Sequence, residues 1–597
     1  MLIGILYVEF LYSERQGTPP RMIQLIRSFI LYTALFVLGI SCSLAQSTFI
    51  PLNDDYYHLI DRLEIKRGKF SEGFHSNMKP FERKAVVALT DSIRKERKVV
   101  LTKIDYTTIN YLRGDSWEWT LSDAPDAEVK EHQLSRVGSI PTTRQRKNRT
   151  FFSNPADLYS IHNEDVDLHV NFVTNNYIGN DNNTDSRLWF TGRGVEIRGI
   201  INKKLGFYTY VSDNQGVFGK YVRDYAAQYN MPGEGLAKQT RNNGTDFLSA
   251  RGYISFRPLK SINVQFGHDR NFIGSGYRSM ILSDNSSPYL FLRIDTHLGK
   301  FQYTNLWTSM INYENFRGGD LLRAKKFTAM HHLSINLSDK FNIGIFEAEV
   351  FSRDSAGQGY DFNYLNPIIF YRFVESYLGS EDNALLGADF RWLVAKRVSI
   401  YGQFMLDEFL TKFYFNKEGS WTKKYAGQLG FKYVDAFGVP NLDLQGEYNV
   451  ARPFTYSHRD GARNYTHFRQ PLAHPLGANF REILGIVRYK ITPNLSLYST
   501  MVWANKGVDY DGKNWGGNIL LDYDTRAGDF GNTIAQGVPL FTRFIDVRVS
   551  QMLAHNLFLE GRYLSRREES PRYTVQQSTR LWSIALRYNI AYRQQTF

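Results

Sequence analysis

The chain has 597 residues, of which 43% are hydrophobic and 22% charged, and its mean hydropathy is −0.38. This composition is too polar for a bundle of membrane-spanning helices, and no Pro-rich or Gly/Ser-rich linker divides residues 166–592 into separate soluble domains. Lys and Arg (72) outnumber Asp and Glu (59), which gives a net charge of +13 without a basic tail or a nucleic-acid motif. We expect no nucleic-acid partner; the excess charge indicates either an ordinary solvated surface or attraction to acidic glycan or lipid phosphate.

Residues 1–45 are predicted to be a targeting segment. Arg27 precedes the apolar run 29–40, and small residues before and at Ala45 provide a cleavage site. Because residues 1–21 fit no part of a signal peptide, translation is expected to start at Met22. The single cysteine, Cys42, offers an alternative, because residues 39–42 weakly resemble a lipoprotein signal that ends at this cysteine. Cleavage after Ala45 would instead remove Cys42 and leave a mature chain without a thiol.

Residues 46–120 carry a helical pattern, which predicts a small periplasmic helical bundle or plug. Apolar residues recur at helical spacing in three stretches, and Pro80 stands where the second helix would begin. The apolar faces comprise Tyr56, Leu59, Ile60 and Leu63; Val86, Leu89 and Ile93; and Ile104, Ile109 and Leu112. The polar residues 121–165 are expected to form a tether.

From Val166 onward the period changes to two, as in β-strands. The alternation from 166 to 172 recurs in roughly 18 segments joined by alternating short and long connections. This pattern, with 15% aromatic residues for two girdles, predicts an all-β transmembrane barrel of the outer-membrane type, with about 18 antiparallel strands over 166–597. Alternation places Val170 and Ile254 toward lipid. The residues expected to face the lumen are Asp167, His169, Asn171, Glu196, Arg251 and Tyr253.

The expected strands end at one side in short turns and at the other in long segments. The long segments are 213–247, 267–288, 311–325, 353–385, 451–479 and 506–540. Long loops of such barrels are extracellular, and short turns are periplasmic. The last strand is expected to run through Tyr592 and close the barrel, and the final residue, Phe597, is the terminal aromatic that outer-membrane assembly commonly recognises.

One long segment, Gly274-Ser-Gly-Tyr-Arg-Ser-Met-Ile-Leu-Ser-Asp-Asn-Ser-Ser-Pro288, resembles the Wzi-type capsule assembly proteins. Their corresponding stretch runs roughly Gly-x-Gly-x-x-Ser, two hydrophobic residues, Leu-Ser-Asn-Asn-x-x-Pro. This chain departs in having Asp284 for an Asn and no Trp before the glycine pair. The resemblance implies an outer-membrane barrel with a helical N-terminal bundle that attaches or exports surface polysaccharide without catalysis. The loops 364–383 and 453–480 resemble a divergent branch linked in part to motility or secretion.

Two long loops carry the residues expected to bind glycan. Aromatic faces pack against the apolar faces of sugar rings, and Arg pairs bidentately with uronate or phosphate. An acidic surface polysaccharide is the expected ligand; the alternative is rim packing and interfacial anchoring. The expected residues are Arg270, Tyr277, Arg278, Asp284 and Asn285 in one loop, and Arg452, Tyr456, Arg459, Arg463 and Tyr465 in the other.

Nothing in the sequence favours an enzyme, a cofactor or a metal site. Gly274 and Gly276 lack the third glycine of a dinucleotide loop, and His458, His467 and His474 have no zinc-ligand spacing. Glu347 and Glu349 share one strand face, which we interpret as part of a lumenal charge network.

Three functions therefore stay open. The first is a glycan-binding assembly barrel in contact with lipopolysaccharide and possible envelope partners. The second is a diffusion porin. The third is a structural part of a secretion or gliding-motility machine, and planar-bilayer conductance separates the first two.

Overall fold

The computed structural model describes residues 46–597 except 97, 121–149, 185, 313–322, 354–358, 369, 380, 408–418, 573–576 and 594. The predicted targeting segment 1–45, with Met22 and Cys42, and most of the predicted tether lie outside the described residues.

Three α-helices precede the sheet: α3 (Asp54–Arg67), α4 (Arg83–Lys95) and α5 (Lys103–Asp115), followed by the 3-10 turn η1 (Trp117–Trp119). Asn53 caps α3 by accepting from two backbone amides, Gly68 ends it at φ 68°, and Thr102 with Asp105 forms a capping box on α5. Their apolar faces meet in one buried cluster that includes Ile60, Leu63, Val86, Leu89, Ile109 and Leu112. Among the described residues, no helix is both long enough and apolar enough to cross a membrane.

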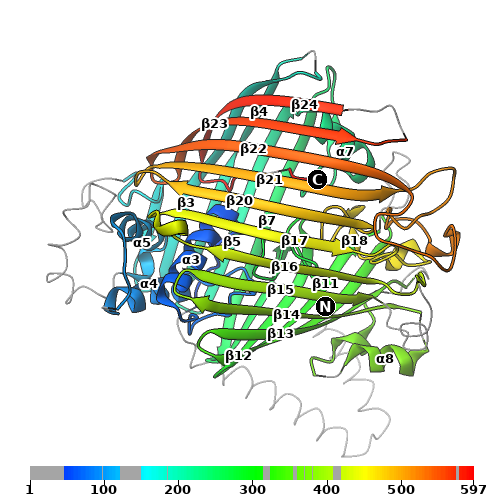
Figure 1. Cartoon of the computed structure of the whole chain (residues 1–597). Coiled ribbons are helices and arrows are strands. Elements are labelled where there is room, and N and C mark those ends of the chain that lie inside the picture. The colour runs from blue at the N-terminus through cyan, green and yellow to red at the C-terminus, as the bar shows by residue number, and fades with distance from the viewer. Residues whose placement is uncertain are drawn as a thin grey trace, which may run out of the picture.

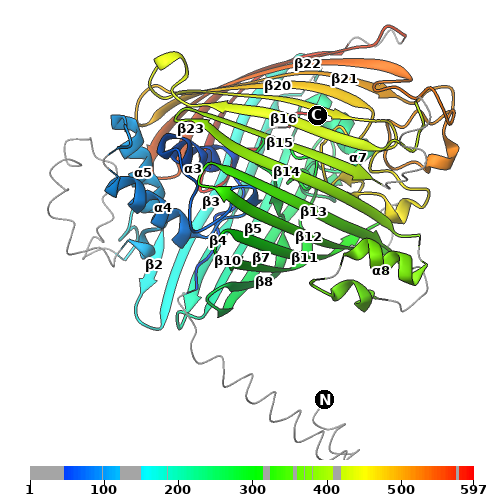
Figure 2. The same cartoon turned by 60° about the horizontal axis from the view of Figure 1, so that its bottom comes forward.

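Within the described residues, 18 antiparallel strands form a closed barrel, which confirms the predicted fold class. Figures 1 and 2 show the helices at one end of the barrel, here called the helix end, and the long connections at the other, the loop end. The barrel strands are β3 (Val166–Asp181), β4 (Leu188–Ile201), β5 (Leu205–Val217), β7 (Thr245–Leu259), β8 (Ile262–Asp269), β10 (Tyr289–Leu298), β11 (Phe301–Ile311), β12 (Lys325–Ser338), β13 (Phe341–Phe351), β14 (Asn383–Ala395), β15 (Val398–Asp407), β16 (Tyr425–Tyr433), β17 (Leu442–Ala451), β20 (Phe480–Lys490), β21 (Leu495–Val508), β22 (Val538–Ala554), β23 (Leu557–Glu569) and β24 (Gln577–Tyr588).

The seam of the barrel is shared by two strands. The last strand, β24, pairs with β3 from Leu581 opposite Asp181 to Tyr588 opposite Thr174. Nearer the start of β3, residues 167–170 pair with the short strand β2 (Tyr159–His162), which places His162 opposite Asp167. Because β2 belongs to the segment that follows the helices, the helical bundle is joined to the barrel at its seam.

The strands send apolar side chains outward. Ile254 on β7 is 47% exposed and Ile483 on β20 is 55% exposed, and exposed aliphatic and aromatic residues recur around the wall. A large exposed apolar surface of this kind suits contact with lipid rather than water.

The described residues of segment 359–382 lie on the outer wall, and they show that the predicted lumenal position of Glu347 and Glu349 is wrong. Its helix α8 (Tyr371–Leu378) and 3-10 turn η3 (Phe362–Leu365) cover the outward-facing Trp307, whose indole donates to the Tyr364 carbonyl at 2.9 Å. The Arg372 amide of α8 donates to Glu347 at 2.9 Å. Glu347 and Glu349 therefore point away from the lumen, since the alternate residues Phe346, Ala348 and Val350 belong to the packed lumenal core.

The last strand also differs from expectation. It ends at Tyr588, and the segment after it turns back into the lumen, where Figure 1 marks the C-terminal end of the chain. Tyr592, expected on the strand, packs its ring 3.7 Å from the Arg548 guanidinium. This cation–π contact and the apolar packing of Ile590 beside Tyr208 and Tyr253 hold the segment inside.

Candidate functional site

The segment that carries the Wzi-like motif descends into the barrel. Within it, β9 (Phe272–Ile273) pairs with β1 (Met78–Lys79) from the helical region, and the Gly274 amide donates to the Asn77 carbonyl at 2.7 Å. We call residues 270–288 the inner loop. It meets the helices inside the lumen, so the long loop expected outside the cell is instead part of the filling of the barrel.

The motif residues are explained by the shape of the inner loop. Gly274 has φ 138°, and a Cβ there would lie 2.5 Å from the Gln403 amide nitrogen. A Cβ on Gly276 would lie 2.7 Å from the Arg278 carbonyl oxygen. The Ser279 hydroxyl donates to the Ile273 carbonyl at 2.6 Å and accepts from two following amides. These residues fix a tight fold that larger or apolar side chains would disrupt.

Tyr456 and Tyr465 hold the inner loop in place. Their hydroxyls donate to the carbonyls of Met280 and Ile281 at 2.6 and 2.9 Å, and both side chains are fully buried. With Leu472 and other apolar residues they form a hydrophobic core inside the loop end of the lumen. Both tyrosines were expected to bind glycan, and the structure gives them packing partners instead.

Arg278 forms a buried ion pair at the same level. Its guanidinium donates to Glu482 at 2.9 and 3.3 Å and to the Thr596 carbonyl at 2.5 Å. Glu482 also accepts from Asn449 at 2.9 Å, and its carboxylate lies 2.8 Å from His474 Nε2. The inner loop, the wall and the C-terminal segment are thereby joined by one charged cluster.

Five of the expected glycan residues line one cavity of about 110 Å³ between the inner loop, α3 and the C-terminal segment. They are Arg270, Tyr277, Arg278, Asp284 and Asn285. Burial, and next the nearby Asp284 carboxylate, raise the pKa of Asp54 in the same cavity to about 7. The cavity is smaller than the ~300 Å³ at which ordinary ligand pockets begin, so it suits water or a small polar group rather than a polysaccharide.

The arginines of the second expected loop lie elsewhere. Arg452 donates to the Asn532 carbonyl at 3.0 Å, and Arg463 pairs with Asp460 at 3.1 Å. Arg459 is exposed at the loop end, where it pairs with Glu381. The three histidines of this region do not share one site, since His467 Nε2 lies 3.0 Å from the Pro288 carbonyl and His474 contacts Glu482.

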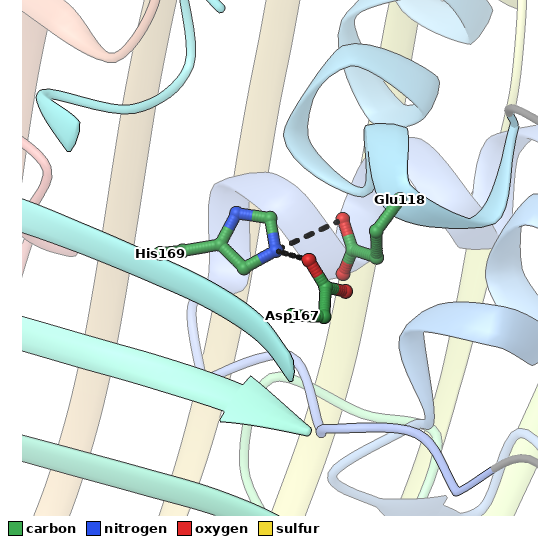
Figure 3. Close-up of side chains that lie close together, drawn as sticks. All are labelled: Glu118, Asp167 and His169. Atoms are coloured by element: carbon green, nitrogen blue, oxygen red, sulfur yellow. Dashed lines mark ion pairs between the residues drawn. The ribbon is translucent and has the colours of Figure 1, made fainter. Parts of the chain in front are cut away.

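The six residues assigned to the lumen by alternation lie near the helix end. Asn171, Glu196 and Arg251 line a cavity of about 160 Å³ that also touches α3 and α5. The Tyr253 hydroxyl accepts from the Phe49 amide at 2.7 Å. Asp167 and His169 lie beside η1, as Figure 3 shows.

Sequence reasoning missed a group of half-buried aromatic residues and arginines at the loop end, which we call the rim cluster: Trp421, Tyr510, Trp515, Arg526 and Arg572. The Tyr510 and Trp515 rings stack with centroids 5.2 Å apart, and the Arg572 guanidinium lies 4.1 Å from the Tyr510 ring. The Arg526 guanidinium lies 4.2 Å from the Trp421 ring. The only sequence signal was the presence of Trp and Arg in long polar segments, because the chain brings them together only in the fold.

Comparison with known proteins supports the fold alone. No family model and no curated protein matches the sequence. The structure is similar to that of Wzi from Escherichia coli, described as an outer-membrane protein involved in group 1 capsule assembly and a carbohydrate-binding β-barrel (TM-score 0.54, 11% identity, 92% of this chain and 100% of that chain). Pseudomonas aeruginosa OprD (TM-score 0.39, 10% identity, 70% and 94%) and Acinetobacter baumannii OccAB2 (0.38, 10%, 70% and 97%) are also similar.

Proposed function

We propose that this chain is a closed outer-membrane barrel, a divergent relative of the Wzi-type proteins, that binds surface polysaccharide at its loop end outside the cell. The observation that carries the proposal is the filling of the lumen from both ends. Helix α3 fills the helix end, where Arg391 pairs with Glu64 at 2.8 Å. The inner loop, residues 452–479 and the C-terminal segment fill the loop end. A barrel filled in this way does not serve diffusion, so its exposed loop end is the surface left for recognition.

The rim cluster suits glycan chemistry. Half-exposed aromatic rings offer flat apolar surface to sugar rings at little entropic cost, because each ring has only two side-chain torsions. Arginines fixed against these rings are planar and permanently charged, so they favour carboxylate or phosphate groups of an acidic polymer. Arg459 lies at the same end, and it remains in the proposed binding set, whereas Tyr456 and Tyr465 support the inner loop.

The test is binding of the host's purified surface polysaccharide to the full chain in detergent at graded salt. Trp515→Ala should remove the stacking surface, and Arg459→Gln with Arg526→Gln should remove two charges. We expect each to weaken binding about tenfold, and the charge variant to lose part of its salt dependence. Arg193→Gln is the matched control, since Arg193 is 70% exposed on the wall and pairs with Asp213. Unchanged binding in folded rim variants would reject the assignment.

The two alternatives give different results. A diffusion porin predicts stable open conductance of the unmodified chain in planar bilayers, whereas a filled barrel predicts a closed baseline. A part of a secretion or motility machine predicts stoichiometric capture of envelope proteins and no polysaccharide binding.

Lipopolysaccharide is the proposed partner of the outer wall. Arg543 on β22 lies directly opposite Arg567 on one side and Trp503 on the other, and these side chains line a shallow groove near the loop end with Arg481. Like charges opposite each other destabilise a sheet, and a phosphate between them offsets this cost. Arg543→Gln should weaken binding of phosphorylated lipid A, while dephosphorylated lipid A should bind both forms equally weakly.

A further inference from the structure

A cluster of charged side chains joins η1 to the first barrel strand. Asp167 and His169 project from the same face of β3, and Glu118 reaches them from η1. Figure 3 shows His169 Nε2 directed toward both carboxylates, 3.2 Å from Asp167 Oδ1 and 3.8 Å from Glu118 Oε2. All three donor atoms lie within 4.8 Å of one another, and within the described part of the chain no other three such residues gather so closely.

The contact made by the second ring nitrogen, Nδ1, determines the tautomer of a neutral His169. Nδ1 lies 2.7 Å from Asp157 Oδ2, so a neutral ring donates from Nδ1 to this carboxylate. Asp157 is itself held by the Trp117 indole at 2.6 Å and the Asn171 amide at 2.9 Å. The lone pair of Nε2 then faces two carboxylates, and Nε2 makes no hydrogen bond of good geometry although His169 is only 1% exposed. Such an arrangement calls for positive charge at Nε2, which either a proton or a bound cation can supply.

The charge balance of this cluster also favours a bound cation. Three carboxylates, those of Glu118, Asp157 and Asp167, surround the ring, and among the described residues the arginine that pairs with this group is Arg198, through Glu118. The Arg198 guanidinium is otherwise engaged with the Asp115 carbonyl at 3.1 Å. Two negative charges therefore remain uncompensated in a buried place when His169 is neutral. A divalent ion supplies two positive charges, whereas a proton on His169 supplies one.

We propose that Glu118, Asp167 and His169 bind a zinc ion that clamps the helical region to the barrel seam. Zinc takes nitrogen and oxygen ligands at ~2.0–2.2 Å in a tetrahedron, which separates neighbouring donor atoms by ~3.3 Å. The separation of 3.2 Å between His169 Nε2 and Asp167 Oδ1 fits this value, and Glu118 Oε2 lies somewhat farther from Nε2, at 3.8 Å. The His169–Asp157 contact is the carboxylate–histidine support that such ligands usually have.

His162 is placed to complete the site. Its Nδ1 lies 3.2 Å from the same Asp167 oxygen, and its side chain is 36% exposed and packs edge-on against the Trp117 ring. Either His162 or water gives the fourth ligand. Because Glu118 follows the helices while Asp167, His169 and His162 lie on β3 and β2, the ion would cross-link the two parts of the chain at the place where the barrel closes.

The experiment uses the full chain in detergent after removal of metal with a chelator. Zinc chloride is titrated by calorimetry, and Co²⁺ is added separately to read the visible absorption of a tetrahedral site. Asp167→Asn keeps the shape of the side chain, and His169→Gln removes the nitrogen ligand. Glu196→Gln is the matched control, because Glu196 is an inward carboxylate on the next strand that accepts from the Tyr208 hydroxyl at 3.1 Å. Heat-modifiable gel migration reports folding of each variant.

We expect one zinc ion per chain in the unmodified protein and in Glu196→Gln, and at least 100-fold weaker binding in Asp167→Asn and His169→Gln. Zinc should also raise the melting temperature of the unmodified chain and leave that of Asp167→Asn unchanged. A folded, metal-free chain that takes up no zinc would overturn the proposal in favour of a protonated His169. Equal uptake by Asp167→Asn would overturn it as well, since the ion would then lie elsewhere.

Discussion

Replacing Arg278 by Gln should destabilise the lumenal packing much more than the same change at Arg459. The Arg278 side chain is 7% exposed and the Glu482 side chain is fully buried, so the variant leaves a carboxylate inside the barrel without its arginine. Breaking a buried pair by removing one partner costs ~3–5 kcal/mol. Arg459 and Glu381 have side chains that are 46% and 59% exposed, and such a surface pair is weak because water and salt screen it.

The assay is urea unfolding in detergent, followed by tryptophan fluorescence and by heat-modifiable gel migration. The double variant Arg278→Gln with Glu482→Gln should recover part of the loss, because neither partner is then a buried unpaired charge. A loss below about 1 kcal/mol for Arg278→Gln, or equal losses at Arg278 and Arg459, would refute the reasoning that the ion pair holds the inner loop.

Three further predictions concern the wall, the C-terminal segment and the helices. Ile254→Arg should cost ~2–4 kcal/mol during folding into lipid vesicles, against ~0–1 for Leu298→Arg at the strand end, and equal costs would contradict the lipid-facing assignment of Ile254. Phe597→Ala removes a ring stacked 3.8 Å from that of Tyr225 and should produce conductance steps in planar bilayers, whereas a silent variant would show that this contact does not close the barrel. Burial, and next Arg488, lower the pKa of His58 to about 4, so the unfolded state binds the proton first as the pH falls below 6.5. Protease resistance of the helices should therefore decline between pH 6.5 and about 4 and decline less in His58→Gln; identical pH profiles would argue against this histidine.

The strands were predictable because alternation is a local property of the chain. The turn at 202–204 and the face of Ile254 follow from a few neighbouring residues, and the barrel then follows from repetition. The same local pattern does not reveal what fills the lumen. Tyr456 and Tyr465 look like binding residues in sequence, since their partners at Met280 and Ile281 are more than a hundred residues away.

Glu347 and Glu349 show why a simple rule of polar residues inside fails here. Where the inner loop fills the lumen with apolar residues, the inward positions of β13 become Phe346, Ala348 and Val350. Segment 359–382 covers the outward positions, which can then hold carboxylates away from lipid. The alternation of side chains along β13 could be predicted from the sequence. Which face carries the polar residues could not, because it depends on what packs against each face.

The shared seam of β3 also sets an order of events in folding. The pairing of β24 with β3 joins residues far apart in the chain, such as Leu581 and Asp181, and pairing across so long a separation forms slowly because the entropy of closing the intervening chain opposes it. The helices and β2 reach β3 over much shorter separations. We therefore expect the barrel to close after the helices have already packed against β3. In this order β24 closes the barrel only after part of its interior has packed. A barrel trapped before that step would expose the edge of β3 beyond the residues that β2 covers.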